Sequence, residues 1–349
     1  MFSFLVKKAP PAPGIITAYI NSQPITVDAK ETLLQAALRQ GIGFPHNCRV
    51  GGCATCKCRL VEGKVRELTD SGYLLTDDEL EQGYILACQS VPQTDVGIEV
   101  ELSGQPLQRS VTGRVVGQDR LTSDITRLRV QLDEALPYRA GQFASISIAA
   151  LPGISRSYSF ATPAQPDSQV SFFVRKVSGG IFSTLINEQG VVGQPVQVDG
   201  PLGDFWLRPA AAPLLLVAGG SGLAPLLAIL HEAVGIGVTR PATLLFGART
   251  ESDLYALEEI SDLARHWRGT LRFIPVLSAA AADAPWNGER GLVTEKMPAV
   301  IEADTHAYLC GPPPMIDGAI ALLRRHGVAR ENIHADRFTT LHDALAAAA

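Results

Sequence analysis

The chain has 349 residues, of which 46% are hydrophobic and 19% are charged. This balance is that of a globular protein and excludes an intrinsically disordered chain. The length suits two or three domains of about 100–150 residues each. A formal net charge of −5 does not favour binding to nucleic acid, so no nucleic-acid partner is expected.

Two stretches bear on targeting. Met1–Lys8 places its apolar run before two lysines, which is the reverse of the order in a secretory signal. Pro213–Leu230 has no charged residue and is long enough to suggest a membrane span. Its centre reads AGGSGLAP, which fits a strand, a turn and a helix better than one helix. We therefore expect a cytoplasmic protein without a membrane span, in a compartment where structural disulfides are rare.

The first predicted domain comprises residues 1–102. Ile15–Ile20 and Pro24–Val27 are short strand-like runs joined by turn residues. Asp28, with a glutamate three positions on, is typical of a helix start, and Gly41 is typical of a helix stop. A hairpin, a helix, a cysteine-rich loop and further strands together predict a small α+β domain.

The second predicted domain comprises residues 109–208 and follows a linker at 103–108. Its apolar residues recur at every second position, as at Val170, Phe172 and Val174, and helix-like periodicity is scarce. This pattern predicts an antiparallel barrel or sandwich.

The third predicted domain comprises residues 209–349. Short apolar runs alternate there with helical patterns, which predicts βαβ units around a parallel sheet. The runs are Leu214–Ala218, Ala242–Phe246, Leu271–Leu277 and His306–Cys310.

Four of the six cysteines lie within the eleven residues CRVGGCATCKC. Cys48, Cys53 and Cys56 follow the spacing C-x4-C-x2-C, and Cys88 comes after 31 intervening residues. This is the spacing of plant-type [2Fe–2S] ferredoxins. Zinc sites usually pair two short knuckles, so zinc is less favoured, as are structural thiols. We expect these four cysteines to bind the cluster and Cys58 to be a small buried strand residue.

The second domain contains the motif Arg156-Ser157-Tyr158-Ser159. An arginine can pair with a pyrophosphate, and a tyrosine ring can lie against an aromatic ring system. Further on, an arginine precedes a glycine pair and a helix start, whose amides and hydroxyls suit phosphate oxygens. Each motif alone could equally be an ordinary barrel turn, and it is their order and spacing that favour a ligand site. The downstream residues are Arg175, Gly179, Gly180, Ser183 and Thr184.

The third domain opens with a buried strand, a glycine turn and a helix with Pro225 in its first turn. Such a turn places a pyrophosphate on a helix N-terminus, although proline stands where the dinucleotide pattern has its third glycine. The turn residues are Gly219, Gly220, Ser221 and Gly222.

A second buried strand of this domain ends at Cys310, Gly311 and Pro312. Open α/β sheets bind ligands at this carboxyl edge, which predicts a site there. The alternative for Cys310 is a small core residue.

In their order, these motifs resemble the ferredoxin–FAD–NAD reductase components of bacterial multicomponent oxygenases, such as the phenol hydroxylase, benzoate dioxygenase and xylene monooxygenase reductases. The resemblance covers nearly the whole chain. It implies a β-grasp [2Fe–2S] ferredoxin domain, an antiparallel β-barrel FAD domain and an α/β parallel-sheet NAD domain. It also implies that Arg156 binds the flavin pyrophosphate, that Tyr158 lies against the isoalloxazine and that Ser159 lies near its reactive edge.

The resemblance carries further roles. Gly180, Ser183 and Thr184 would hold the flavin phosphate, and Cys310 would lie beside the nicotinamide, so that Cys310, Ser159 and Tyr158 form the catalytic set. Phe338 closes the stretch Asp336-Arg-Phe, where many relatives have an acid, a base and a phenylalanine. Since aspartate replaces glutamate, a proton-handling role for Asp336 stays open.

The expected cofactors explain one another. A nicotinamide gives up two electrons together as hydride, a [2Fe–2S] cluster accepts one at a time, and a flavin can do both. We expect electrons to pass from NADH to FAD, then to the cluster, and then to a terminal oxygenase or an intermediate ferredoxin. A desaturase, dehydratase or deoxygenase partner is an alternative, as is a redox sensor.

Two surface features complete the expectations. Glu251 and Asp253 lie near Arg249 after the second strand of the third domain, which favours NADH over NADPH. Basic residues flank the cluster loop and acidic residues precede Cys88, which is typical of a solvated mixed-charge surface. As a hypothesis, the basic residues dock transiently on an acidic patch of the partner. The basic residues are Arg49, Lys57 and Arg59.

Overall fold

The computed structural model describes residues 16–46, 51, 55–75, 77–102, 108–280, 285–302 and 304–338. The chain forms two compact units, one up to Gln105 and one from Pro106 onward. Each unit has its own buried core.

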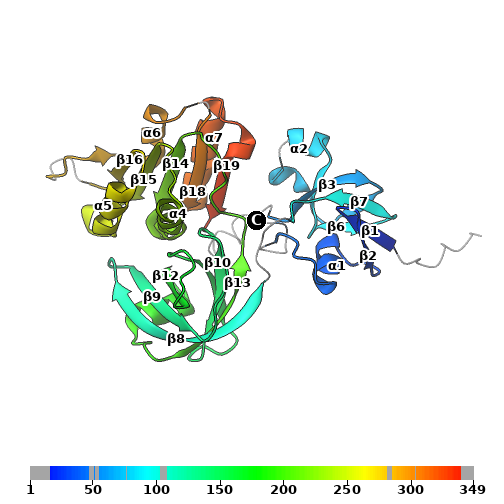
Figure 1. Ribbon diagram of the computed structural model, residues 1–349, viewed down its shortest axis with the longest axis horizontal. Helices are drawn as coiled ribbons and strands as arrows, with labels where there is room; N and C mark the ends of the chain where they lie inside the picture. Colours follow the sequence, from blue (N-terminus) through cyan, green and yellow to red (C-terminus); the bar gives the residue numbers. More distant parts are fainter. Residues whose placement is uncertain are drawn as a thin grey trace, which may run out of the picture. The chain divides into compact units, whose positions relative to one another are not determined.

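The first unit is built on a five-stranded sheet in the order β2-β1-β7-β3-β5, in which β1 and β7 run parallel and the other pairs antiparallel (Figure 1). A two-stranded sheet, β4-β6, lies beside it in the fold. This is the α+β β-grasp arrangement that the resemblance implied. Its elements are β1 Ile16–Ile20, β2 Gln23–Val27, α1 Leu33–Arg39, β3 Lys57–Glu62, β4 Val65–Glu67, η1 Ser71–Tyr73, α2 Asp77–Glu81, β5 Tyr84–Leu86, β6 Ser90–Pro92 and β7 Val96–Glu99.

Helix α1 begins later than the sequence suggested. Its N-cap is Thr32, whose hydroxyl accepts a hydrogen bond from the Gln35 N–H at 3.2 Å, while Gln35 Oε1 accepts from the Thr32 N–H at 2.9 Å. The prediction that Asp28 caps this helix is therefore wrong. Both residues are followed by Glu or Gln three positions on, and the helix starts where the buried residues Leu33 and Leu34 begin.

The second unit begins with a six-stranded antiparallel sheet in the order β11-β10-β13-β8-β9-β12. A single bridge between Phe160 and Phe172 joins its two ends, so the sheet is a nearly closed barrel. Its elements are β8 Arg109–Arg120, β9 Ile125–Leu132, β10 Phe143–Ile148, β11 Ser155–Ser159, β12 Gln169–Arg175, α3 Ile181–Glu188 and β13 Pro195–Leu202.

The same unit continues as a six-stranded parallel sheet in the order β17-β16-β15-β14-β18-β19. Helices α4 and α5 cover one face, and α6 and α7 cover the other (Figure 1). The elements are β14 Leu214–Gly219, η2 Gly220–Gly222, α4 Leu223–Gly235, β15 Ala242–Ala248, η3 Glu251–Asp253, α5 Leu257–His266, β16 Leu271–Leu277, β17 Glu289–Arg290, α6 Val293–Lys296, η4 Met297–Ala299, β18 His306–Gly311, α7 Pro313–Arg325, η5 Arg330–Asn332 and β19 Ile333–Arg337.

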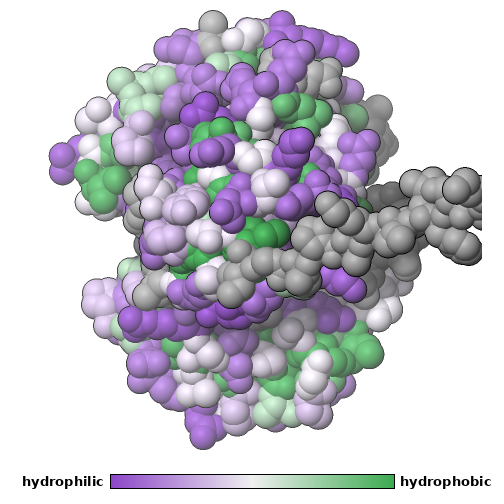
Figure 2. All heavy atoms as spheres, turned by 90° about the vertical axis from the view of Figure 1, so that its right-hand side faces the viewer, coloured by the Kyte–Doolittle hydropathy of each residue, from purple (hydrophilic) through white to green (hydrophobic). Residues whose placement is uncertain are grey.

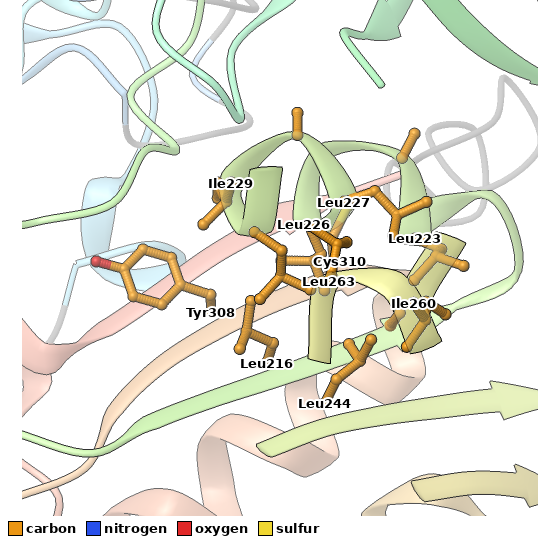
Figure 3. Packing of buried hydrophobic residues seen from close by; sticks show 14 of the residues in the cluster. Leu216, Leu223, Leu226, Leu227, Ile229, Leu244, Ile260, Leu263, Tyr308 and Cys310 are labelled. Carbon is orange, nitrogen blue, oxygen red and sulfur yellow. The ribbon is translucent and has the colours of Figure 1, made fainter. Parts of the chain in front are cut away.

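The barrel and the parallel sheet share one apolar core. Phe173 of β12 packs edge-on against Tyr255 with ring centroids 5.5 Å apart, and Tyr255 packs in the same way against Phe246 of β15. Figure 3 shows the sheet side of this core, where Leu226 and Leu227 of α4 meet Leu216 of β14. Strand β12 is thus buried on both faces, which its alternating pattern did not predict.

An ionic contact adds to this shared core. Glu259 of α5 accepts from Arg127 of β9 at 2.8 Å and lies 2.8 Å from His231 Nε2 of α4. These charges tie the barrel to the helices that cover the sheet.

The uncharged stretch Pro213–Leu230 forms β14, the short turn η2 and the first half of α4. Across the part of the chain that the structure describes, none of the helices has the length and apolar character needed to cross a membrane.

The position of the α1 cap can be tested with two variants. Thr32→Ala should lower the free energy of unfolding of the first unit by about 1 kcal/mol, because it removes the acceptor for a first-turn N–H. Asp28→Ala should change it much less. Urea unfolding of the holoprotein, followed by loss of visible cluster absorption, measures both. An Asp28→Ala effect as large as that of Thr32→Ala would contradict the assignment.

Candidate electron-transfer site

Two of the four predicted cluster ligands lie in the described part of the first unit, and both are buried. The Cys88 N–H donates to Cys56 Sγ at 3.4 Å, and Gln89 Nε2 donates to Cys88 Sγ at 3.6 Å. Backbone and amide N–H groups aimed at sulfur stabilise thiolate ligands and tune a cluster. These two cysteines therefore fit an iron–sulfur centre. Cys48 and Cys53 lie outside the described residues.

Cys58 belongs to a different environment. It lies in β3, only 1% exposed, and burial raises the pKa of its thiol to about 12. This agrees with the prediction of a small buried strand residue.

The basic residues beside the cluster loop are already paired inside the first unit. Lys57 Nζ lies 2.6 Å from Glu79 Oε1, and Arg59 Nη2 lies 2.5 Å from Glu99 Oε2. Arg49 is outside the described residues. The positive character expected of this surface is therefore partly offset by neighbouring carboxylates.

The Arg156-to-Ser159 motif forms most of β11, at one end of the barrel sheet. Tyr158 is half-buried, and its ring centroid lies 5.6 Å from that of Phe182 in α3. Burial raises the pKa of Tyr158, so its hydroxyl stays neutral. Arg156 is exposed and donates to the Ser155 carbonyl at 2.7 Å. An exposed arginine and a half-buried ring on one strand fit a flavin nucleotide.

The predicted phosphate turn leads into α3. Gly179 has φ +71°, and a Cβ on Gly180 would lie 2.7 Å from Ser183 Oγ, so both glycines are needed for this turn. Ser183 Oγ accepts from the Val177 N–H and donates to the Gly180 carbonyl, each at 3.1 Å. Its hydroxyl thus shapes the turn. The phosphate role of Ser183 and Thr184 stays a prediction.

The nucleotide turn follows β14. A Cβ on Gly222 would lie 2.2 Å from the Cys310 carbonyl, and a Cβ on Gly219 would lie 2.7 Å from Met315 Sδ. Glycine is therefore required for the turn to approach the end of β18. The Gly220 carbonyl accepts from the Tyr255 hydroxyl at 2.9 Å. A tight backbone turn at the start of α4 fits the pyrophosphate of a dinucleotide.

Barrel and sheet residues meet beside this turn. Ser159 Oγ of β11 donates to Asp336 Oδ2 of β19 at 3.4 Å, and Asp336 is the strand partner of Cys310. Burial raises the pKa of Asp336 to about 6, although the Ser159 hydrogen bond opposes the shift. The Phe338 N–H donates to the Gly311 carbonyl at 2.9 Å. The structure thus brings together Ser159, Cys310 and Asp336, which lie far apart in the sequence.

Cys310 itself is wholly buried. Its side chain lies in the apolar cluster beneath α4 (Figure 3), and burial raises the pKa of its thiol well above the ordinary value. The thiol is therefore neutral. A role for it beside the nicotinamide stays a prediction.

The comparisons agree with this geometry. Residues 18–93 match the 2Fe-2S iron–sulfur cluster binding domain, residues 112–206 the oxidoreductase FAD-binding domain and residues 216–320 the oxidoreductase NAD-binding domain. The electron transfer component of xylene/toluene monooxygenase from Pseudomonas putida is 40% identical over 332 residues, which cover 94% of this chain and 95% of the relative. The reductase component of phenol 2-monooxygenase from Pseudomonas sp. strain CF600 is 36% identical, with coverage of 94% and 95%. The chain belongs to the reductase components of oxygenase systems.

A solved structure supports the same assignment for this reductase. The cytochrome P450 reductase GcoB of Amycolatopsis is similar with a TM-score of 0.74 and 30% identity, over 93% of this chain and 99% of that one. The reductase is thus an NAD(P)H-dependent flavin and iron–sulfur oxidoreductase. The predicted fold class and the three cofactors, a [2Fe–2S] cluster, FAD and NAD, are confirmed.

Sequence reasoning about the reductase left two acids without a role. No motif indicates that Asp336 contacts Ser159 or that Asp124 binds two arginines. Asp124 is 51 residues from Arg175 and 125 residues from Arg249. One sequence without an alignment contains no signal that joins positions so far apart.

The raised pKa of Asp336 predicts a pH-dependent effect on stability. Between about pH 4 and pH 6 the folded state keeps a proton that the unfolded state has lost, so Asp336 lowers the free energy of unfolding as pH rises through this range. Asp336→Asn should therefore stabilise the reductase by roughly 1–3 kcal/mol above pH 6 and by little near pH 4. Urea unfolding across this range measures the difference. A stability difference that does not change with pH would contradict the assignment.

Proposed function

We propose that this reductase takes hydride from NADH and delivers single electrons through its [2Fe–2S] cluster to a terminal oxygenase or an intermediate ferredoxin in the cytoplasm. The observation that carries the proposal is the meeting of Ser159 from the barrel with Asp336 from the parallel sheet, next to the glycine turn. A flavin held by the barrel and a nicotinamide held by the sheet would share that place. The names of the relatives, which serve monooxygenases, support an oxygenase as partner.

The roles are those that the motifs imply, and the positions of the described side chains support them. Arg156 and the turn before α3 would bind the flavin phosphates, Tyr158 would lie against the isoalloxazine, and Ser159 would donate to its reactive edge. When bound, FAD accepts a hydride and releases electrons singly, which is the conversion that a one-electron cluster requires. Cys56 and Cys88, with Cys48 and Cys53, would hold the cluster.

Several groups of the chain itself would prepare the hydride step. The neutral thiol of Cys310 and the apolar side chains around it exclude water from one side of the site. Asp336, whose pKa burial raises to about 6, can gain or lose a proton beside Ser159 close to neutral pH. These groups keep the reacting edge dry and place a proton-exchanging carboxyl beside it.

Docking would depend on the charges around the cluster loop. On the face seen in Figure 2, small apolar areas are separated by hydrophilic residues. Since Lys57 and Arg59 already pair with carboxylates, Arg49 is the basic residue on which we base the docking proposal.

The proposed electron path can be tested at one ligand. Cys88→Ser should lower NADH–cytochrome c reduction by more than about tenfold, because it removes a cluster ligand. Reduction of a two-electron dye directly from the flavin should persist. Cys58→Ser is the matched control, since it alters a neighbouring buried cysteine that is not a ligand. Equal cytochrome c rates in both variants would overturn the path, and a wild type that NADH fails to bleach would overturn the proposed function.

The docking proposal makes a separate prediction. Arg49→Glu should slow reduction of the partner protein and weaken its dependence on ionic strength, while NADH oxidation with a dye is unchanged. Arg39→Glu, on α1 of the same unit, is the control. Stopped-flow reduction of the partner at several salt concentrations measures the effect. Identical salt slopes for wild type and Arg49→Glu would remove the proposal.

A further inference from the structure

Asp124, in the turn between β8 and β9, binds two arginines with one oxygen. Its Oδ2 accepts from Arg175 Nε and from Arg249 Nη2, each at 3.2 Å. Arg175 is the last residue of β12 in the barrel, and Arg249 follows β15 of the parallel sheet. One carboxylate therefore links the two nucleotide-binding parts of the second unit.

The carboxylate is itself held in place. Its Oδ1 accepts from the Thr122 hydroxyl at 3.0 Å, and the Asp124 carbonyl accepts from the Lys176 N–H at 2.7 Å. The Asp124 side chain is 21% exposed. A group fixed on both sides in this way can set the direction of its arginine partners.

Arg175 is directed at the nucleotide turn. Its Nη1 lies 3.6 Å from the position that a Cβ on Gly220 would take. Within the described ranges, Asp124 takes only the Nε of this guanidinium, and both of its Nη groups remain for a ligand. The sequence motifs group Arg175 with the flavin turn, whereas its guanidinium lies beside Gly220 of the nucleotide turn.

Arg249 is held at one edge by a second acid. Asp253 accepts from its Nε at 3.1 Å and from its Nη2 at 2.9 Å, which is a bidentate pair. The Arg249 side chain is 54% exposed, and the described carboxylates bind its Nε and Nη2 but not its Nη1. Two carboxylates thus fix the orientation of this arginine.

Both arginines lie at the carboxyl edge of the sheet. Gly219, at the end of β14, is the strand partner of Gly247, two residues before Arg249. The same turn leads directly into the N-terminus of α4. A planar guanidinium matches the oxygens of one phosphate group, so two guanidiniums that share one carboxylate beside a glycine turn match a pyrophosphate.

We propose that Arg175 and Arg249 together bind the pyrophosphate of the nicotinamide dinucleotide, and that Asp124 is the positioning residue that aims both of them. This inference rests on the proposed function and adds residues to its nucleotide site. It also gives Arg249 a different task from reading a 2′-phosphate, and a comparison of NADH with NADPH distinguishes the two tasks.

The variants Arg249→Gln and Asp124→Asn test the proposal in the holoenzyme. Arg249→Gln should raise KM for NADH about tenfold and change kcat by less than about twofold, with the same factor for NADPH. Asp124→Asn should also raise KM, although it removes a negative charge from an anion site. Arg129→Gln is the matched control, because Arg129 pairs with Asp119 at 3.0 Å on the same barrel.

A readout independent of turnover comes from competitive binding. ADP contains the pyrophosphate and adenosine does not, so the inhibition constant of ADP should rise in both variants while that of adenosine stays unchanged. FAD content, measured from the spectrum, should equal that of the wild type.

Three results would overturn the proposal. A rise in KM that is confined to NADPH would show that Arg249 binds the 2′-phosphate. A lower KM for NADH in Asp124→Asn would show that Asp124 only offsets the positive charge of the two arginines. Unchanged KM and inhibition constants in all variants would show that Asp124 and its two arginines form only a surface ion pair. Each of these leaves the proposed function standing, which fails only if NADH does not reduce the wild-type flavin and cluster.

Discussion

The shared core of the barrel and the parallel sheet is the constraint on which the nucleotide site depends. Phe173 reaches out of the barrel to Tyr255, and Tyr255 also packs against Phe246 of the sheet while its hydroxyl donates to Gly220. Because protein interiors are close-packed, these contacts permit little sliding of one part over the other. The distance between Ser159 on the barrel and Asp336 on the sheet is set in this way.

Charge acts at the rim of that core. Glu259 joins Arg127 of the barrel to His231 of α4, and Asp124 joins Arg175 to Arg249. These are partly exposed pairs, each of modest value for stability. Their effect is to fix directions, since a guanidinium with one edge bound to a carboxylate presents its other edge to a ligand.

Much of the fold could be predicted from the sequence because its signals are local. The cysteine spacing and the glycine turn after Leu214–Ala218 lie within short stretches, and apolar runs mark the parallel strands. Local signals fail to locate a helix start where two stretches have the same capping pattern, as with Asp28 and Thr32. The helix begins after Thr32 because the buried residues begin there. Local signals also fail for β12, because alternation reports one buried face and the second face is buried by a distant part of the chain.

The site shows the same limit. The motifs name candidate residues, but they do not indicate what each side chain contacts. The Ser183 hydroxyl bonds within its own turn, and Lys57 pairs with Glu79. Asp336 meets Ser159 across 177 positions of sequence. Such contacts come from the tertiary fold, which one sequence does not encode in any short pattern.

The division into two units has a consequence for how such reductases diversify. The barrel and the parallel sheet are inseparable, since each buries residues of the other, whereas the ferredoxin unit keeps a core of its own. Evolution could therefore replace the ferredoxin unit, and so change the electron acceptor, without altering the unit that binds flavin and nicotinamide. Recombination at the junction near Gln105 would leave the buried core of each unit intact.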